Sequence, residues 1–334
     1  MLKNIGVFES YEDGTIKSVF IDSENRVIEI SLLKNKEYDV LCVPTHHYCS
    51  LGCRMCHLTK EGAKRCMSQI ESKDLMEAIY KTMIIDGEKI TNKNKLLISF
   101  MGVGDPLLNF DLIKETFFNE EALKKLGYLD INYALATMMP IDNMEYITKE
   151  VNEFNIPLKI HYSMHSPKEE IRKSLIPGSK VNIEDALEKL KNYREVIQNN
   201  SIIMDSYKKF HHTLDPTEIH YTLIRDVNDS KFELALMINF LNCFEIPLKF
   251  IKFNPKDELE YSSNQEYWVQ TIKEVLPNMR IKEYDPPGHD VGASCGEFTK
   301  HYYLSEMESM EDYQEFIAWY NKHAVKDPHR LIKK

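Results

Sequence analysis

The chain has 334 residues, of which 43% are hydrophobic and 28% charged, a balance typical of folded globular proteins. Its formal net charge is −10, so an RNA substrate would need a local basic patch rather than an overall positive field. No apolar run reaches the roughly 18 residues of a membrane span, and the first residues do not resemble a signal peptide. The odd number of cysteines, seven, argues against a disulfide framework and predicts a reducing, cytoplasmic location with no membrane partner.

The two ends of the chain are expected to flank a larger core. Residues 1–36 predict a small N-terminal β appendage, with strands at 16–21 and 26–33 separated by a polar turn. Residues 281–334 predict a C-terminal extension that is rich in turns and contains a helix at 310–323.

Strands and helices alternate through residues 37–280, which predicts parallel strands joined by crossover helices. We therefore expect an α/β fold, a partial (β/α)6 TIM-like barrel whose site lies at the carboxyl ends of its strands. Ser72 and Asn182 are the expected N-caps of two helices, and residues 199–216 are expected to be a long connection. The expected strands are 40–44, 95–102, 131–138, 158–165, 218–226 and 248–254, and the expected helices are 72–86, 110–126, 143–154, 183–198, 231–244 and 265–276.

Three cysteines in the loop after the first barrel strand, Cys49, Cys53 and Cys56, have the spacing C-x3-C-x2-C. Thiolates are the usual ligands of a [4Fe–4S] cluster, and three of them leave one iron open to a small molecule. This spacing is the signature of radical S-adenosylmethionine (SAM) enzymes, in which the open iron binds SAM. A zinc knuckle is the alternative, but zinc usually needs a fourth Cys or His, and His57 beside Cys56 is poorly placed to supply it.

Polar residues also follow the other expected strands and would surround the same barrel mouth. Gly104 lets the backbone approach a ligand closely, and Asp105 can bind the ammonium group of SAM, although such a glycine pair is also a common turn. Ser163 and His165 point to the same side of their strand because side chains alternate, but polar residues can simply face a barrel mouth. Asn254 can donate to a carboxylate and accept from a hydroxyl, although Asn-Pro is also an ordinary turn. These five residues are the candidate SAM site.

Two cysteines outside this motif, Cys42 and Cys295, complete a pattern that resembles the RlmN/Cfr family of radical SAM adenosine methyltransferases. The resemblance extends over about residues 13 to 300, and the cysteine pair is its most specific part, because generic radical SAM enzymes lack it. The other matching segments are 101–109, 163–172, 225–229, 254–255 and 290–296.

The resemblance implies a chemistry for carbon 2 or carbon 8 of adenine, which are not nucleophilic. One SAM would methylate Cys295, and a second, cleaved at the cluster, would give a deoxyadenosyl radical that takes a hydrogen from the S-methyl group. The resulting carbon radical would add to an adenine in ribosomal or transfer RNA. Cys42 would then attack the thioether sulfur and release the product as a disulfide forms. Glu29, thirteen residues before Cys42, would be the base that removes the ring proton, and a solvent-facing strand residue is the alternative reading.

The resemblance also implies a reductant such as flavodoxin or ferredoxin, and we expect a monomer. Three departures from the family bear on SAM binding or on the substrate. Asp105 stands where the family has Glu, and Ala136 where it usually has Ser. The sequence starts at the β appendage, whereas family members carry a helical N-terminal domain that helps dock RNA. Other substrates therefore stay open, such as a nucleotide, a short RNA or a peptide, as does a non-catalytic iron–sulfur protein. Cys42 and Cys295 argue against the last, because binding alone needs neither thiol.

Overall fold

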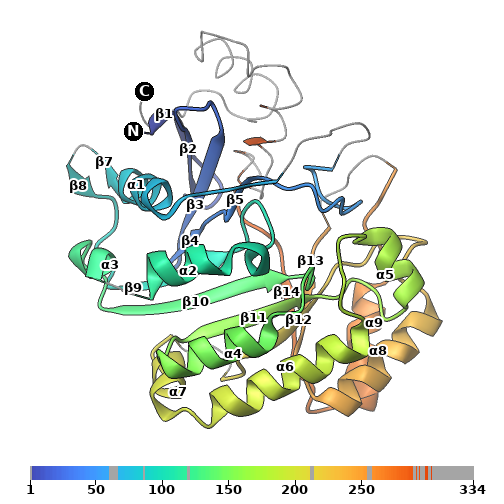
Figure 1. The fold of residues 1–334 in the computed structure, drawn as a ribbon. Coiled ribbons are helices and arrows are strands. Elements are labelled where there is room, and N and C mark those ends of the chain that lie inside the picture. Colours follow the sequence, from blue (N-terminus) through green and yellow to red (C-terminus); the bar gives the residue numbers. More distant parts are fainter. Residues whose placement is uncertain are drawn as a thin grey trace. The chain divides into compact units, whose positions relative to one another are not determined.

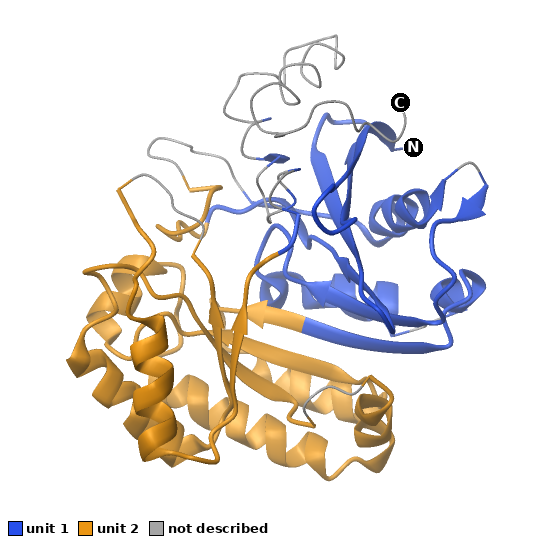
Figure 2. Cartoon of the chain, turned by 180° about the vertical axis from the view of Figure 1, so that it is seen from behind, with its two compact units in different colours: residues 1–50, 60–134, 287–334 blue, residues 51–59, 135–286 orange. Residues whose placement is uncertain are grey.

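A computed structural model describes residues 2–59, 67–85, 87–118, 121–210, 214–253 and 258–288, and after these residues 291, 293, 298, 299 and 302. The chain divides into two compact units, which Figure 2 shows in different colours. The first unit comprises residues 1–50, 60–134 and 287–334, and the second comprises residues 51–59 and 135–286. Strand β10 (Asp130–Thr137) contains the boundary between them.

The first unit is built on strands in the order β1-β2-β3-β4-β9-β10 (Figure 1). Strands β1 (Lys3–Glu9), β2 (Ile16–Ile21) and β3 (Val27–Lys34) form an antiparallel meander. Strand β4 (Asp39–Cys42) then pairs antiparallel with β3 and parallel with β9 (Lys95–Phe100). The expected N-terminal β segment is therefore present, and it continues the sheet through β3 instead of standing apart from it.

Helices α1 (Ser72–Met83) and α2 (Phe110–Phe117) pack against each other in this unit, and α1 also contacts β3. The prediction of Ser72 as an N-cap was wrong, because the helix is capped at Glu71, and Ser72 Oγ instead accepts a hydrogen bond of 2.8 Å from Thr116. The single helix expected at 110–126 is two helices. The remaining elements of the unit are β5 (His46–Tyr48), β6 (Ser68–Gln69), β7 (Ile84–Ile85), β8 (Glu88–Lys89), η1 (Pro106–Asn109) and α3 (Glu121–Lys125).

The second unit has the strand order β10-β11-β12-β13-β14, and the pairs from β11 to β14 are parallel. The expected connection at 199–216 contains a helix, α7, because the Asn200 side chain accepts hydrogen bonds from the N–H groups of Ile202 and Ile203 and caps it. Strand β14 and helix α5 were not expected either. The strands are β11 (Leu158–Ser163), β12 (Thr217–Tyr221), β13 (Leu248–Ile251) and β14 (Ile281–Tyr284), and the helices are α4 (Met144–Glu153), α5 (Glu169–Leu175), α6 (Ile183–Gln198), α7 (Ser201–Lys208), α8 (Lys231–Phe244) and α9 (Gln265–Val275).

Alternation along these strands separates an apolar face from a polar one. Tyr162 and Tyr221 face the helices, since Arg172 of α5 lies 5.1 Å from the ring centroid of Tyr162 and Trp268 of α9 lies 5.4 Å from that of Tyr221. Residues in the alternate register point to the opposite face of the sheet. This polar face, the inner face of the partial barrel, carries Lys159, His161, Ser163, Glu218, His220, Lys249 and Lys282.

The parallel strands with crossover helices confirm the expected α/β fold of a partial barrel. Asn182 is an N-cap as expected, because its side chain accepts a hydrogen bond of 2.9 Å from the Asp185 N–H. Within the described parts of the chain, no helix has the length and apolar character that a membrane crossing requires. The helix expected at 310–323 lies outside the described residues.

Candidate active site

The second half of the cysteine motif lies in a tight loop of the second unit. The Cys56 N–H donates to the Cys53 carbonyl over 3.0 Å, and the Arg54 N–H donates to Leu175 at the end of α5 over 2.8 Å. Gly52 has φ +76°, a left-handed conformation that glycine adopts without strain. Cys53 also packs against an apolar cluster that includes Leu175. The loop is thus held by backbone hydrogen bonds and apolar packing, while its thiols stay partly exposed.

Cys49 directly follows strand β5 in the first unit and is also partly exposed. The three motif cysteines thus present partly exposed sulfur atoms. A soft thiolate donor set of this kind fits an iron–sulfur cluster, which is usually held by cysteine sulfur. The residues present are therefore compatible with the expected cluster.

Glu29 lies in a buried ion pair, so the reading of Glu29 as a solvent-facing residue is wrong. Its side chain is 6% exposed, and Lys17 Nζ, at 1% exposure, lies 3.1 Å from Glu29 Oε2. The strand registers pair Lys17 with Ser31 and Ser31 with Cys42, and paired residues share a face of a sheet. Glu29 is two residues before Ser31 and so shares that face. The expected base and the expected resolving thiol thus lie on one face, beside a buried ammonium group.

The Cys42 thiol is strongly influenced by this environment. Burial, together with the negative charge of Glu29, raises the pKa of Cys42 to about 12, although the Met101 N–H and the positive charge of Lys17 act in the opposite direction. A thiol with this pKa is protonated at neutral pH and is a poor nucleophile until a base removes its proton. Cys42 therefore depends on a proton acceptor. Glu29 is the carboxylate whose negative charge raises the pKa of Cys42.

Described residues near the C-terminus contact the same face of the first unit. The Thr299 N–H donates to Glu29 Oε2 over 3.4 Å, and the Ser31 hydroxyl donates to the Ala293 carbonyl over 3.3 Å. The Phe298 ring lies 6.5 Å from that of Phe8 on β1. Cys295 itself lies outside the described residues, between Ala293 and Phe298.

Gly104 and Asp105 both have structural roles in the first unit. Gly104 has φ +100°, and a Cβ atom there would lie 2.2 Å from Nδ1 of His46, so only glycine fits. Asp105 is buried and caps helix η1, since its Oδ1 accepts a hydrogen bond of 3.0 Å from the Leu107 N–H. The pKa of His46 is lowered to about 4, mainly by burial and also by the neighbouring His47, so this imidazole is neutral at pH 7.

Ser163 is the last residue of β11 in the second unit, and His165 lies two residues beyond it, so the strand alternation expected for this pair does not reach His165. His165 has φ +54°, and its Nδ1 accepts a hydrogen bond of 3.2 Å from the Thr222 N–H. Its carbonyl accepts a second bond, of 2.5 Å, from the Asn228 side chain. Burial and the charge of Arg172 lower the pKa of His165 to about 3, so its ring is neutral. Asn254 lies outside the described residues.

Sequence reasoning missed Lys17 and Ser31. Lys17 is the only charged residue in the segment Ile16–Ile21 and, taken alone, indicates a solvent-facing strand position. Only the antiparallel register of β2 and β3 reveals its proximity to Glu29. The one sequence signal that could have indicated a buried partner is a lysine within a largely apolar strand segment, and the structure shows every residue of this strand buried.

The chain is similar to known proteins over most of its length. No family model matches the chain. It is 26% identical over 312 residues to a probable dual-specificity RNA methyltransferase RlmN of Alkaliphilus metalliredigens, covering 91% of this chain and 79% of the relative. A second RlmN relative, from Lachnoclostridium phytofermentans, is 26% identical over 301 residues, covering 88% of this chain and 76% of that protein. Among solved structures, a radical SAM methyltransferase from Sphaerobacter thermophilus matches with a TM-score of 0.66 at 18% identity, covering 89% of this chain and 80% of that one.

The fold is that of a solved radical SAM methyltransferase, and the three-cysteine motif has the spacing typical of radical SAM enzymes. Together with the similarity to RlmN relatives over most of the chain, this fold supports an RlmN/Cfr-like radical SAM methyltransferase.

Proposed function

We propose that the protein methylates an sp2 carbon of adenine, C2 or C8, in RNA, and that the methyl group travels through S-methylated Cys295. The relatives support RNA as the substrate class, because their names describe RNA methyltransferases. One observation carries the mechanism. Glu29 and Cys42 share a face of the sheet, and Thr299, four residues after Cys295, donates to Glu29.

Chain length supports the pairing of Cys42 with Cys295. Two peptide links separate residue 295 from Ala293, a span of about 7 Å when fully extended. Ala293 accepts a hydrogen bond from Ser31, whose register partner on β4 is Cys42. A disulfide needs Cα atoms about 4.4–6.8 Å apart, a separation that this tether allows.

Glu29, Cys42 and Cys295 each have one role in the proposed reaction. When bound at Cys49, Cys53 and Cys56, the cluster would supply the electron for reductive cleavage of SAM. Cys295 carries the methyl carbon, which becomes bonded to the adenine ring. Addition of the carbon radical leaves an unpaired electron on the ring, so the adduct has to lose one electron as well as a proton, and the cluster, when bound, would take up that electron. Glu29 accepts the proton that leaves the ring carbon, and Lys17 balances the carboxylate charge within the buried pair.

Cys42 completes the reaction by releasing the product. Its deprotonated sulfur attacks the sulfur of Cys295, so an S–S bond forms while the S–C bond to the substrate breaks. The electron pair of the broken bond stays on carbon, which takes up a proton and becomes the product methyl group. Because the pKa of Cys42 is about 12, this attack needs prior transfer of the thiol proton to a neighbouring base.

The other assignments extend this proposal. SAM is bound by the candidate residues Gly104, Asp105, Ser163, His165 and Asn254. The protein acts as a cytoplasmic monomer that receives electrons from a flavodoxin or a ferredoxin. The sequence resemblance supports this SAM site and this source of electrons.

Mass spectrometry of the purified protein tests the proposal. In protein expressed with its cluster, the peptide that contains Cys295 is expected to be heavier by one CH2 group. The peptide containing Cys243, an exposed cysteine of α8, is the matched control and should be unmodified. An unmodified Cys295 in a preparation that cleaves SAM would rule out the methyl-carrier role.

A further inference from the structure

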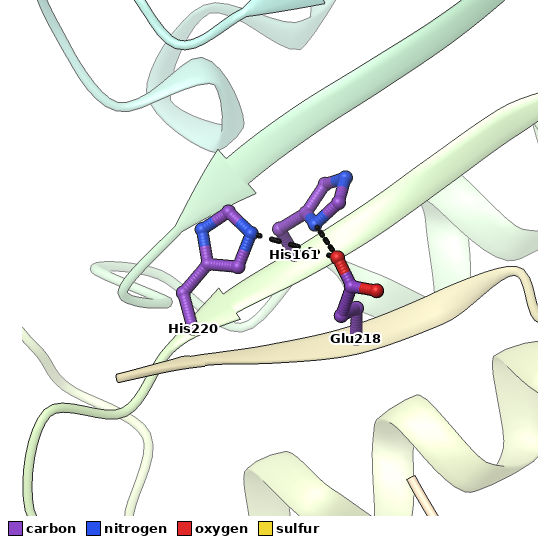
Figure 3. Close-up of side chains that lie close together, drawn as sticks. All are labelled: His161, Glu218 and His220. Atoms are coloured by element: carbon purple, nitrogen blue, oxygen red, sulfur yellow. Dashed lines mark ion pairs between the residues drawn. The ribbon is translucent and has the colours of Figure 1, made fainter. Parts of the chain in front are cut away.

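Two histidines and a glutamate converge on the polar face of the second unit, and none of the three has been assigned a role above. His161 lies on β11, and Glu218 and His220 lie on β12 (Figure 3). Their candidate donor atoms all lie within 4.8 Å of one another, and all three residues are buried. We propose that His161, Glu218 and His220 form a binding site for a divalent transition-metal ion of the zinc type.

The distances between donor atoms suit a metal ion. Nδ1 of His161 lies 3.1 Å from Oε2 of Glu218, and Nε2 of His220 lies 3.8 Å from the same oxygen. Zinc binds histidine nitrogen and carboxylate oxygen at about 2.0–2.2 Å, so two of its tetrahedral ligands lie about 3.4 Å apart. Both distances to Oε2 are close to this spacing, and all three donor atoms lie within 4.8 Å of one another, so small side-chain shifts would let one ion contact all three.

The imidazole nitrogens also lack other partners. Apart from the nearby Oε2 of Glu218, neither Nδ1 of His161 nor Nε2 of His220 has a polar partner among the described residues, although both atoms are buried. A buried polar atom without a partner is costly, and native proteins usually satisfy such atoms.

The surrounding lysines orient the carboxylate and are the main competitors of an ion. Nζ of Lys159 and Nζ of Lys282 lie 3.1 and 3.2 Å from Oε1 of Glu218, which leaves Oε2 directed at the histidines. Carboxylate ligands of metals are commonly held in this way through their other oxygen. Lys249, a register neighbour of His220, adds a third ammonium group on the same face of the sheet.

The competing arrangement is an ionic network in which the lysines alone neutralise Glu218 and no metal binds. Nζ of Lys159 and Nζ of Lys282 are close enough to Oε1 of Glu218 for this second arrangement. Metal binding itself has to be measured to distinguish them.

The test titrates zinc into the protein with its iron–sulfur cluster in place. Equilibrium dialysis with elemental analysis should find one zinc per chain, in addition to the cluster iron. His161→Gln and His220→Gln should each weaken zinc binding at least about 100-fold, since loss of a ligand exceeds the effect of losing an outer partner. His47→Gln is the matched control, because His47 is also buried and lies 3.7 Å from a carboxylate oxygen of Asp22. Equal zinc affinity in the wild type and both site variants would overturn the proposal.

Cobalt(II) provides a readout that does not depend on the variants folding. Bound to the wild-type protein at this site, it should show the visible bands of a four-coordinate ion without the thiolate charge-transfer band that cysteine ligands produce. A thiolate band would place the ion at cysteines and refute the site, as would the absence of any bound cobalt. This inference does not depend on the methyl-transfer proposal, because neither measurement involves SAM or RNA.

Discussion

The Cys42→Ala protein is expected to accumulate covalently attached to its RNA substrate. Without the resolving sulfur, the bond between the Cys295 methylene and the adenine still forms, but the S–C bond cannot be broken. Product release should fall to background, while the cluster and SAM cleavage are retained. Denaturing electrophoresis of the variant expressed in its host should show a shifted band that nuclease removes.

Two further variants make this result specific to the pair of cysteines. Cys295→Ala and the double variant Cys42→Ala/Cys295→Ala carry no methyl group and should show no shifted band. Cys243→Ala removes an exposed cysteine of α8 and should behave like the wild type. If Cys42→Ala shows no adduct although its Cys295 is methylated, then either the substrate is not RNA or Cys42 is only a buried thiol.

Replacing Cys53 by alanine is expected to abolish the cluster and every later step. One lost thiolate opens a second iron, and the cluster then has only two protein ligands. The reconstituted variant should lack the iron–sulfur absorbance, and formation of 5′-deoxyadenosine from SAM should fall to background. Chromatographic analysis of the SAM reaction measures this directly.

The Cys42→Ala variant is the matched control for Cys53→Ala. It also removes one thiol, but one that the cluster does not use, and it should retain both the absorbance and 5′-deoxyadenosine formation. A Cys53→Ala protein that still holds a complete cluster and cleaves SAM would show that the motif has been misassigned.

Local signals in the sequence were sufficient to predict several elements. The helix expected at 231–244 is α8, with the same ends, because Ser230 and Glu233 form a capping box that defines its start. Asn200 caps α7 in a similar way, but it lies in a polar stretch that is typical of a loop, and the helix was missed. Element ends were therefore predictable where a cap is followed by a clear apolar repeat.

The grouping of the site residues was less predictable, since it depends on strand register. Glu29 was identified by its spacing from Cys42, but no local pattern pairs it with Lys17. That contact requires β2 and β3 to meet with Val19 opposite Glu29. His161 and Glu218 are likewise far apart in sequence, and the parallel register of β11 and β12 places them opposite each other. A change of one residue in register would place each of these side chains on the wrong face.

The most direct test of methyl transfer through Cys295 uses SAM with a fully deuterated methyl group. The protein, with its cluster and a reductant, would react with total RNA from host cells that lack the gene, and mass spectrometry would identify the methylated nucleoside. One deuterium is lost when hydrogen is taken from the S-methyl group, and the released carbon takes up one proton from its surroundings. Transfer through Cys295 therefore predicts methyladenosine whose methyl group carries two deuterium atoms and one hydrogen. A methyl group with all three deuterium atoms would show direct transfer from SAM and would contradict transfer through Cys295.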